Sequence, residues 1–224
     1  MTALEFVAFD LETTGFDVDD EITVAGFALP LGCRVFVQTG THDVDETALE
    51  QTVRDRTDHH IQCSTHDSET ALLEAVGDFA TARLADGDYL LVGYNAERWK
   101  DGFDLPFLRT RLAATGVAWP FQSLPYADLL PVIDRRFNTS IDGERNADLV
   151  GAYGTLCDGA LNELDPFDDS AQAVAAFEDG RLADLVVHNI ADVCRTAALG
   201  DLTQRYCSKS DYDLKSLTAR IHDA

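Results

Sequence analysis

Two carboxylates stand one residue apart near the start of the chain, where "FDLETTGF" places Asp10 and Glu12 just after the apolar run "EFVA". Residues i and i+2 of a strand point to the same side, so a strand over residues 6–9 would end with the two carboxylates side by side. Like charges this close repel unless a positive charge lies between them. A divalent cation is the simplest candidate, because hard cations bind carboxylate oxygens. Since 40 of the 224 residues are Asp or Glu, such a pair also arises by chance and needs independent partners.

A third carboxylate, Asp104, lies in "LLVGYNAERWKDGFDLPFLRTR". A strand-like run leads into a Gly-Tyr-Asn turn, and Asp104 then precedes an apolar helical segment. An Asp before Leu-Pro is a common helix cap, so this position has a structural interpretation beside the chemical one.

A histidine and a fourth carboxylate lie in "VVHNIADVCRTAAL", where His188 and Asp192 are four residues apart. On a helix they occupy one face, one turn from each other. Taken alone, such a pair is compatible with a surface hydrogen bond or a helix-face histidine as well as with chemistry.

The segments around these residues predict the elements that must position them. "EITVAGFAL" and "CRVFVQTG" are β-rich and separated by "PLG", which predicts an antiparallel meander for the first three strands. "SETALLEAVGDFATARLA" and "DLPFLRTRLAATG" have helical periodicity, and "DYLLVGYN" and "LPYADLLPVI" have strand-like patterns. "THDVDETALEQTVRDRTDHHIQC" is ambiguous; from residue 147 the chain is expected to be mostly helical, with a break at "DPFDDS" and a long final helix or helix pair. This order predicts one α/β domain over residues 1–224, with a central mixed five-stranded sheet flanked by helices.

The formal net charge of −23 would ordinarily argue against a nucleic-acid partner. The acidic residues are nevertheless spread through the whole chain, and lysine occurs only at Lys100, Lys209 and Lys215. This pattern resembles proteins of salt-in halophiles, in which molar salt shortens the Debye length to about 3 Å and screens the repulsion. The charge is therefore interpreted as a property of the solvent more than of the ligand.

The composition also bounds the location of the protein. No window approaches eighteen uninterrupted apolar residues and no signal sequence is recognisable, so we expect a soluble, cytoplasmic protein without a membrane partner. The five cysteines are scattered and never spaced as C-x-x-C, which predicts reduced core residues and no zinc site.

In their order along the chain, "FDLETTG", "GYN…FDLPFLRTR" and "HNIADV" resemble the three exonuclease motifs of the DEDD superfamily of 3′→5′ exonucleases, which have an RNase H-like fold. The likeness is greatest to the proofreading domains of family-B DNA polymerases and their stand-alone relatives. It extends from Glu5 to about Leu199 and includes "YADLLPVI" and "ADLVGAYGTLC", and together with the charge pattern it suggests a haloarchaeal member.

The resemblance implies roles for individual residues. Asp10, Glu12, Asp104 and Asp192 would hold two Mg²⁺ or Mn²⁺ ions, and His188 would be the general base. Thr13 and Asn95 would contact the terminal nucleotide or position the site.

This sequence departs from the family pattern at two places. Three residues separate His188 from Asp192, the spacing of members that have a tyrosine in place of the histidine. Asn95 and Asp104 are separated by the insert "AERWKDGF", longer than the family spacing. Its Trp99 would stack on a base at the rim of the site, and the alternative is that Trp99 packs back on the domain.

The sequence therefore predicts a metal-dependent exonuclease that hydrolyses a single-stranded DNA or RNA 3′ end to nucleoside 5′-monophosphates, with a role in DNA repair. The alternative is a catalytically inactive, exonuclease-like module that binds nucleic acid or a polymerase or repair partner. A third interpretation, a protein with chance acidic motifs, requires three coincidences in the correct order.

Overall fold

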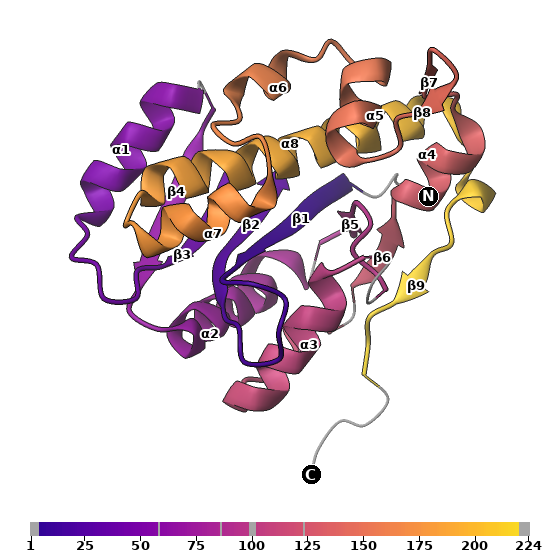
Figure 1. The fold of residues 1–224 in the computed structure, drawn as a ribbon. Coiled ribbons are helices and arrows are strands. Elements are labelled where there is room, and N and C mark those ends of the chain that lie inside the picture. Colours follow the sequence, from indigo (N-terminus) through magenta and orange to yellow (C-terminus); the bar gives the residue numbers. More distant parts are fainter. Residues whose placement is uncertain (1–4, 58, 86, 99–101, 123, 220–224) are drawn as a thin grey trace.

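The computed structural model describes residues 5–57, 59–85, 87–98, 102–122 and 124–219. Within this part of the chain, seven strands form one mixed sheet in the order β4-β3-β2-β1-β5-β6-β9 (Figure 1). The strands are β1 (Glu5–Thr13), β2 (Ile22–Leu29), β3 (Gly32–Gln38), β4 (Ile61–His66), β5 (Tyr89–Gly93), β6 (Pro125–Asp128) and β9 (Lys215–Ser216). The first three pair antiparallel, as predicted, whereas β5 is parallel to β1 and β6 is parallel to β5. The predicted α/β class and mixed sheet are therefore confirmed.

The predicted count of five strands is wrong, because β4 and β9 extend the sheet at its two edges. β4 lies in the ambiguous polar segment and pairs parallel with β3, burying Ile61 and Cys63 while Gln62 is exposed. An edge strand with this pattern has no continuous apolar run to reveal it. β9 is only two residues long and pairs antiparallel with β6, so its place depends on a distant segment and not on its own sequence.

Helices cover both faces of the sheet (Figure 1). They are α1 (Glu46–Thr57), α2 (Glu69–Phe79), α3 (Asp104–Thr115), α4 (Leu130–Arg136), α5 (Leu149–Leu156), α6 (Ala160–Leu164), α7 (Ser170–Glu178) and α8 (Leu182–Tyr206). A π-helical turn (Ala80–Leu84) extends α2, a 3-10 turn (Lys209–Asp211) follows α8, and β7 (Ser140–Ile141) and β8 (Glu144–Arg145) form a small separate hairpin. The predicted final helix or helix pair is a single helix, α8, and the predicted break at 165–170 lies between α6 and α7.

The alternation of β1 decides which side chains enter which layer. Val7, Phe9 and Leu11 join the apolar core under α2 and α3, while Ala8 joins the core under α1, α7 and α8. Because side chains two apart share a face, Asp10 and Glu12 lie on the α8 side of the sheet with Ala8.

A buried ion pair anchors the loop that follows β1. Arg111 of α3 donates to Glu69 of α2, with Nη2 and Oε2 2.8 Å apart, and its Nη1 donates to the carbonyl of Val18 at 2.7 Å. Glu69 also accepts the backbone N–H of Ile22 at the start of β2. The loop over residues 14–21 is thereby tied to both helices beneath it.

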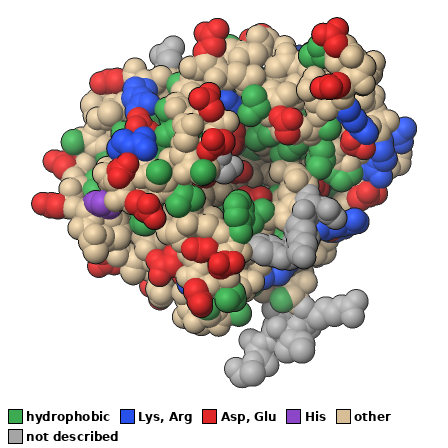
Figure 2. All heavy atoms as spheres, in the orientation of Figure 1, with side chains coloured by type: hydrophobic (Ala, Val, Ile, Leu, Met, Phe, Trp, Pro, Cys, Tyr) green, Lys and Arg blue, Asp and Glu red, His purple; other side chains and the backbone are tan. Residues whose placement is uncertain are grey.

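Acidic side chains are distributed over the face seen in Figure 2, whereas Lys and Arg side chains gather mainly toward its sides. Hydrophobic side chains border the hollow near the centre of this face. Among the described residues, no helix combines the length and apolarity that crossing a membrane requires. Cys33, Cys63 and Cys194 are buried free thiols, and Cys157 and Cys207 are half-buried free thiols.

Candidate active site

The carboxylate of Asp104 contacts the backbone of β1. β1 pairs with β5 only as far as Ala8, so beyond that residue the edge of β1 that faces β5 has no strand partner in the part of the chain that the structure describes. Asp104 opens α3 and its Oδ1 accepts the N–H of Leu11 at 3.0 Å. It does not cap its own helix in the way the sequence suggested as an alternative; it instead joins the start of α3 to the strand segment between Asp10 and Glu12.

α8 brings the histidine and the fourth carboxylate to the same place. His188 and Asp192 lie one turn apart, and Nε2 of His188 is 3.8 Å from Oδ2 of Asp192 and 3.9 Å from Oε1 of Glu12. The candidate ligand atoms of Glu12, His188 and Asp192 all lie within 4.8 Å of one another. Two of the four predicted carboxylates and the histidine thus form one compact group, although Glu12 and Asp192 are 180 positions apart in the sequence.

Burial and mutual repulsion raise the pKa values of the carboxylates in this group. Burial is the main cause for Asp10, whose pKa is raised well above its usual value, and the charges of Asp104, Glu12 and Asp192 add to it. Burial also raises the pKa of Glu12 to about 7, although the charge of His188 opposes the shift. The pKa of Asp104 is raised to about 7 by burial, against the effect of its backbone hydrogen bonds.

The pKa of Asp192 is likewise raised by burial, and here His188 and Arg195 oppose the rise. Anionic oxygens packed in this way are destabilised unless a cation joins them, so the pKa values of all four carboxylates point to a cation site.

The three predicted contacts with substrate have different outcomes. Thr13 is buried at the end of β1 and donates through Oγ1 to the carbonyl of Gly15 at 2.7 Å. Asn95 is exposed, has a left-handed backbone (φ 59°) and lines a separate hollow with Arg98, Arg135 and Lys215. Trp99 lies outside the described residues.

Asp128, which the sequence reading did not single out, shapes the turn around Asn95. Its carboxylate accepts the backbone N–H groups of Asn95, Ala96 and Glu97 at 2.9–3.2 Å. The turn after β5 is therefore fixed from the end of β6, one strand away. An Asp directly after the apolar strand "YA" was the only sequence signal for this role.

Asn189 is a second residue that the sequence interpretation missed. Its side chain is fully buried between α8 and the sheet, and Nδ2 donates to Oδ2 of Asp10 at 2.9 Å and toward Oε1 of Glu12 at 3.4 Å. Among the described side chains its Oδ1 is one of few buried oxygens that accept no hydrogen bond. A buried amide next to His188 leaves no sequence signature, because the 3.6-residue period alone does not show which face of α8 meets β1.

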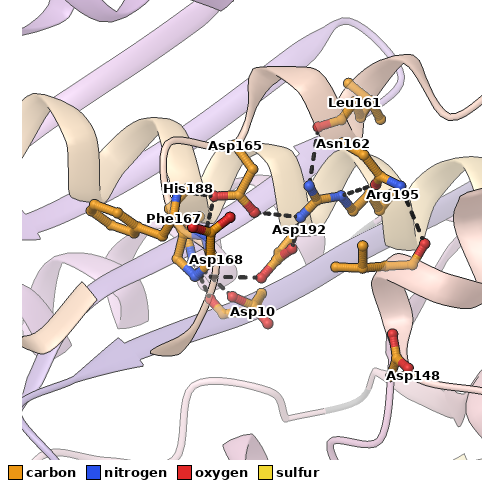
Figure 3. A network of polar contacts seen from close by, with 12 residues as sticks. Asp10, Asp148, Leu161, Asn162, Asp165, Phe167, Asp168, His188, Asp192 and Arg195 are labelled. Carbon is orange, nitrogen blue, oxygen red and sulfur yellow. Dashed lines mark hydrogen bonds and ion pairs between the residues drawn. The ribbon is translucent and has the colours of Figure 1, made fainter. Parts of the chain in front are cut away.

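A polar network behind His188 was missed as well (Figure 3). Nδ1 of His188 lies 2.7 Å from Oδ1 of Asp165, which follows α6 directly. Arg195, one turn beyond Asp192 on α8, bridges Asp165 and Asp192 through Nη1 at 2.7 and 2.5 Å.

Burial alone would lower the pKa of His188. The hydrogen bond to Asp165 and the charges of Glu12 and Asp192 outweigh burial and raise this pKa to about 9. In the metal-free protein the ring is therefore protonated at neutral pH.

An apolar hollow of about 350 Å³ adjoins the acidic group. Glu12 and Thr13 form part of its lining, together with Phe16, Phe103 and Val174. Phe16 and Phe103 meet edge to face, with ring centroids 4.9 Å apart, and Phe16 is 60% exposed. Flat apolar groups beside the carboxylates could contact an aromatic ring of a bound molecule.

The residues present fit hard divalent cations. The compact group offers carboxylate oxygens from β1 and α8 with one imidazole, the carboxylate of Asp104 lies beside it at the start of α3, and the set contains no thiolate, which favours Mg²⁺ or Mn²⁺ over softer ions. A scan against protein-family models and a search of curated proteins each found no match to this chain. The case for a function therefore rests on the residues and their geometry.

Proposed function

We propose that the protein is a metal-dependent 3′→5′ exonuclease acting on single-stranded nucleic acid ends. The observation that carries this proposal is that Glu12, His188 and Asp192, from β1 and α8, form one compact group, and that the charges of Asp104, Glu12 and Asp192 act on Asp10 beside it. The pKa values of all four carboxylates are raised. Three weak motifs far apart in the sequence meet at one point, which chance acidic motifs have no reason to do.

The fold is compatible with this proposal. The five central strands, three in an antiparallel meander followed by two parallel ones, have the arrangement that the resemblance to RNase H-like exonucleases implies. Since one fold serves many functions, this similarity supports the proposal only together with the site.

Asp10, Glu12, Asp104 and Asp192 would hold the metal ions, two according to the resemblance. Ions bound there would neutralise phosphate oxygens and acidify a water molecule, which is the chemistry that phosphodiester hydrolysis requires. The buried carboxylates are held in place before binding, because Asp104 is fixed by Leu11 and Asp10 by Asn189. Little reorganisation is therefore needed on binding.

His188 would accept a proton at Nε2, and the position of this atom near Glu12 and Asp192 supports that role. A histidine can act as a base only in its neutral form. The pKa of His188 in the metal-free protein is about 9, and the charges of those two carboxylates contribute to this rise. The pKa of His188 would fall toward neutrality once these carboxylates hold cations, because their charge would no longer favour the imidazolium.

The apolar hollow would receive the terminal nucleobase. Phe16 and Phe103 offer ring surfaces there, and base–aromatic stacking contributes about 1–3 kcal/mol and tolerates molar salt. Stacking of this kind is sequence-tolerant and suits a strand end without a partner strand.

The proposal is tested by incubating the purified protein with 5′-labelled single-stranded DNA and RNA in molar salt with Mn²⁺. A ladder that shortens from the 3′ end is expected, and the matched control Asp104→Asn should leave the substrate intact. Asn preserves size and an acceptor for the N–H of Leu11, so its loss of cleavage would not reflect unfolding. Binding of the strand without any cleavage, across metals and salt concentrations, would favour an inactive binding module.

A second experiment needs no substrate. Thermal unfolding with and without Mn²⁺ or Mg²⁺ should show a metal-dependent increase in Tm, because a ligand that binds only the native state stabilises it. Absence of this shift would count against the metal site itself.

A further inference from the structure

The loop between α6 and α7 carries a carboxylate directly behind the candidate base. Asp165 lies at the end of α6, and in Figure 3 its carboxylate points down toward α8, between His188 and Arg195. Its Oδ1 lies 2.7 Å from Nδ1 of His188 and also accepts the N–H of Phe167 at 3.1 Å. None of the three exonuclease motifs includes this residue.

Arg195 holds Asp165 in place. Its Nη1 donates to Oδ2 of Asp165, and its other nitrogens donate to Oδ1 of Asn162 at 3.0 Å and to the carbonyl of Leu161 at 3.1 Å. The side chain is 1% exposed, so water does not compete for these bonds. The guanidinium thus fixes the end of α6 onto α8.

The hydrogen bond at Nδ1 determines the orientation of the imidazole. A neutral imidazole carries its proton on one nitrogen, and the partner of that nitrogen selects which one. Asp165 is 2.7 Å from Nδ1, whereas Nε2 is 3.9 Å from Glu12 and 3.8 Å from Asp192. The closer carboxylate therefore holds the proton at Nδ1 and leaves the lone pair of Nε2 directed at the acidic group.

We propose that Asp165 is the positioning residue of His188. It keeps Nε2 of the ring directed toward the carboxylates and selects the tautomer in which Nε2 accepts a proton. Arg195 holds the carboxylate of Asp165 in position. The value of this arrangement for catalysis rests on the proposed nuclease function. The tautomer of His188 does not depend on that function.

The tautomer is measured with ¹⁵N-histidine labelling and long-range ¹H–¹⁵N spectra of the metal-free protein, at an alkaline pH at which the ¹⁵N shifts show a neutral ring. The His188→Ala variant assigns the signal. In the wild-type protein we expect a protonated Nδ1 and an unprotonated Nε2. In Asp165→Ala the proton should move toward Nε2, because the remaining carboxylates lie on that side.

Cleavage kinetics provide the second readout. Asp165→Ala should lower kcat by at least roughly 10–100-fold, the range for removing the hydrogen-bond partner of a histidine at a metal site, with little change in KM or Mn²⁺ affinity. The matched control is Asp184→Ala, which removes a carboxylate from the same α8, one turn before His188, where it pairs with Arg56 and Arg181. That variant should leave both readouts unchanged.

If Asp165→Ala does not fold, the isosteric Asp165→Asn replaces it. Arg195 offers only donors, so the amide oxygen must face Arg195 and the NH₂ group must face His188, and donation to Nδ1 would likewise shift the proton to Nε2. A folded Asp165 variant whose His188 tautomer matches wild type would overturn the proposal. So would wild-type kcat in such a variant. A wild-type protein that shows the expected tautomer but cleaves nothing would refute the nuclease function and leave the role of Asp165 in orienting the ring intact.

Discussion

The α-carbon of Gly26 faces the side-chain oxygen of Asn189: a Cβ at position 26 would lie 1.8 Å from Oδ1 of Asn189. Gly26 is paired with Asp10 in the β1–β2 register, so the space left by the missing side chain lies beside the acidic group. Asn189 fills this space and donates to Asp10. A glycine on a neighbouring strand thereby determines how closely α8 approaches β1.

Gly26→Ala should displace Asn189 and separate α8 from β1. We expect a loss of stability of about 1–3 kcal/mol, as for other overpacked sites, and a fall in Mn²⁺ affinity. Isothermal titration and urea unfolding measure the two effects. Gly77→Ala is the matched control, because a Cβ there meets nothing within 4 Å and the residue lies within α2, where alanine stabilises by up to about 1 kcal/mol. Equal Mn²⁺ affinity in both variants would contradict a role for Gly26 in the site.

Asp10→Ala should abolish metal-dependent cleavage without unfolding the protein. At pH 8 the metal-free variant should be at least as stable as wild type, because one of several mutually repelling buried carboxylates is gone. Denaturant unfolding in EDTA tests the stability, and the labelled-strand assay tests the activity. Retention of near-normal metal-dependent cleavage would remove Asp10 from the metal site.

The metal-free protein should lose stability as the pH rises from 5 to 9. The pKa values of Glu12 and Asp104 are raised to about 7 and that of His188 to about 9, and a raised folded-state pKa gives stability that is present at low pH and lost on passing through that pKa. The pKa of Asp165 is lowered, so its ionisation increases stability as the pH rises, and this gain is already complete below pH 5. The free energy of unfolding in EDTA should fall by at least about 2 kcal/mol over this range.

Two controls accompany that measurement. Saturating Mn²⁺ should flatten the pH dependence, because bound cations favour the ionised carboxylates. Glu12→Gln should reduce the slope near pH 7 without metal. A stability that instead rises from pH 5 to 9 in EDTA would show that the carboxylates are not ionised against repulsion.

His188→Ala should lower kcat by about 10²–10⁴-fold with metal affinity nearly unchanged, if His188 is the base. His188→Tyr should keep more activity than His188→Ala, because the three-residue spacing to Asp192 is the one found in tyrosine-containing members of the exonuclease superfamily that the sequence resembles. The wild-type rate should fall on acidification through the histidine pKa, and that inflection should disappear in His188→Tyr. If His188→Ala has the rate and pH profile of wild type, His188 is only a helix-face residue.

Phe16→Ala should raise KM for a single strand roughly 10-fold and change kcat less, because stacking holds the ground state and the transition state alike. Val18→Ala in the same loop is a suitable control, since Val18 is exposed but does not line the hollow beside Glu12. Steady-state kinetics on strands that differ only in the terminal base measure the effect. An equal KM for Phe16→Ala and Val18→Ala would place the base elsewhere.

The sequence by itself determined the parts of the protein that depend on local patterns. The two-residue spacing at the end of a strand expected over residues 6–9 predicted that Asp10 and Glu12 share a face, and the four-residue spacing predicted the same for His188 and Asp192. The meander, the two following strands and the end of α3 at Gly116 could also be predicted from the sequence, because strand pleat, helical period and a left-handed C-cap are properties of short segments.

Only the tertiary structure determined which residues far apart in the sequence contact one another. β4 and β9 form by pairing with the edges of β3 and β6. Asp104 accepts the N–H of Leu11 because the pairing of β5 with β1 ends at Ala8 and leaves that N–H available. Asn189, Asp165 and Arg195 acquired their roles in the same way, from partners that lie 23 to 179 residues away or across a helix turn. Hydrogen bonds and charges act over a few ångströms in space, so their partners are fixed by packing, whereas local periodicity records only which side of an element is buried.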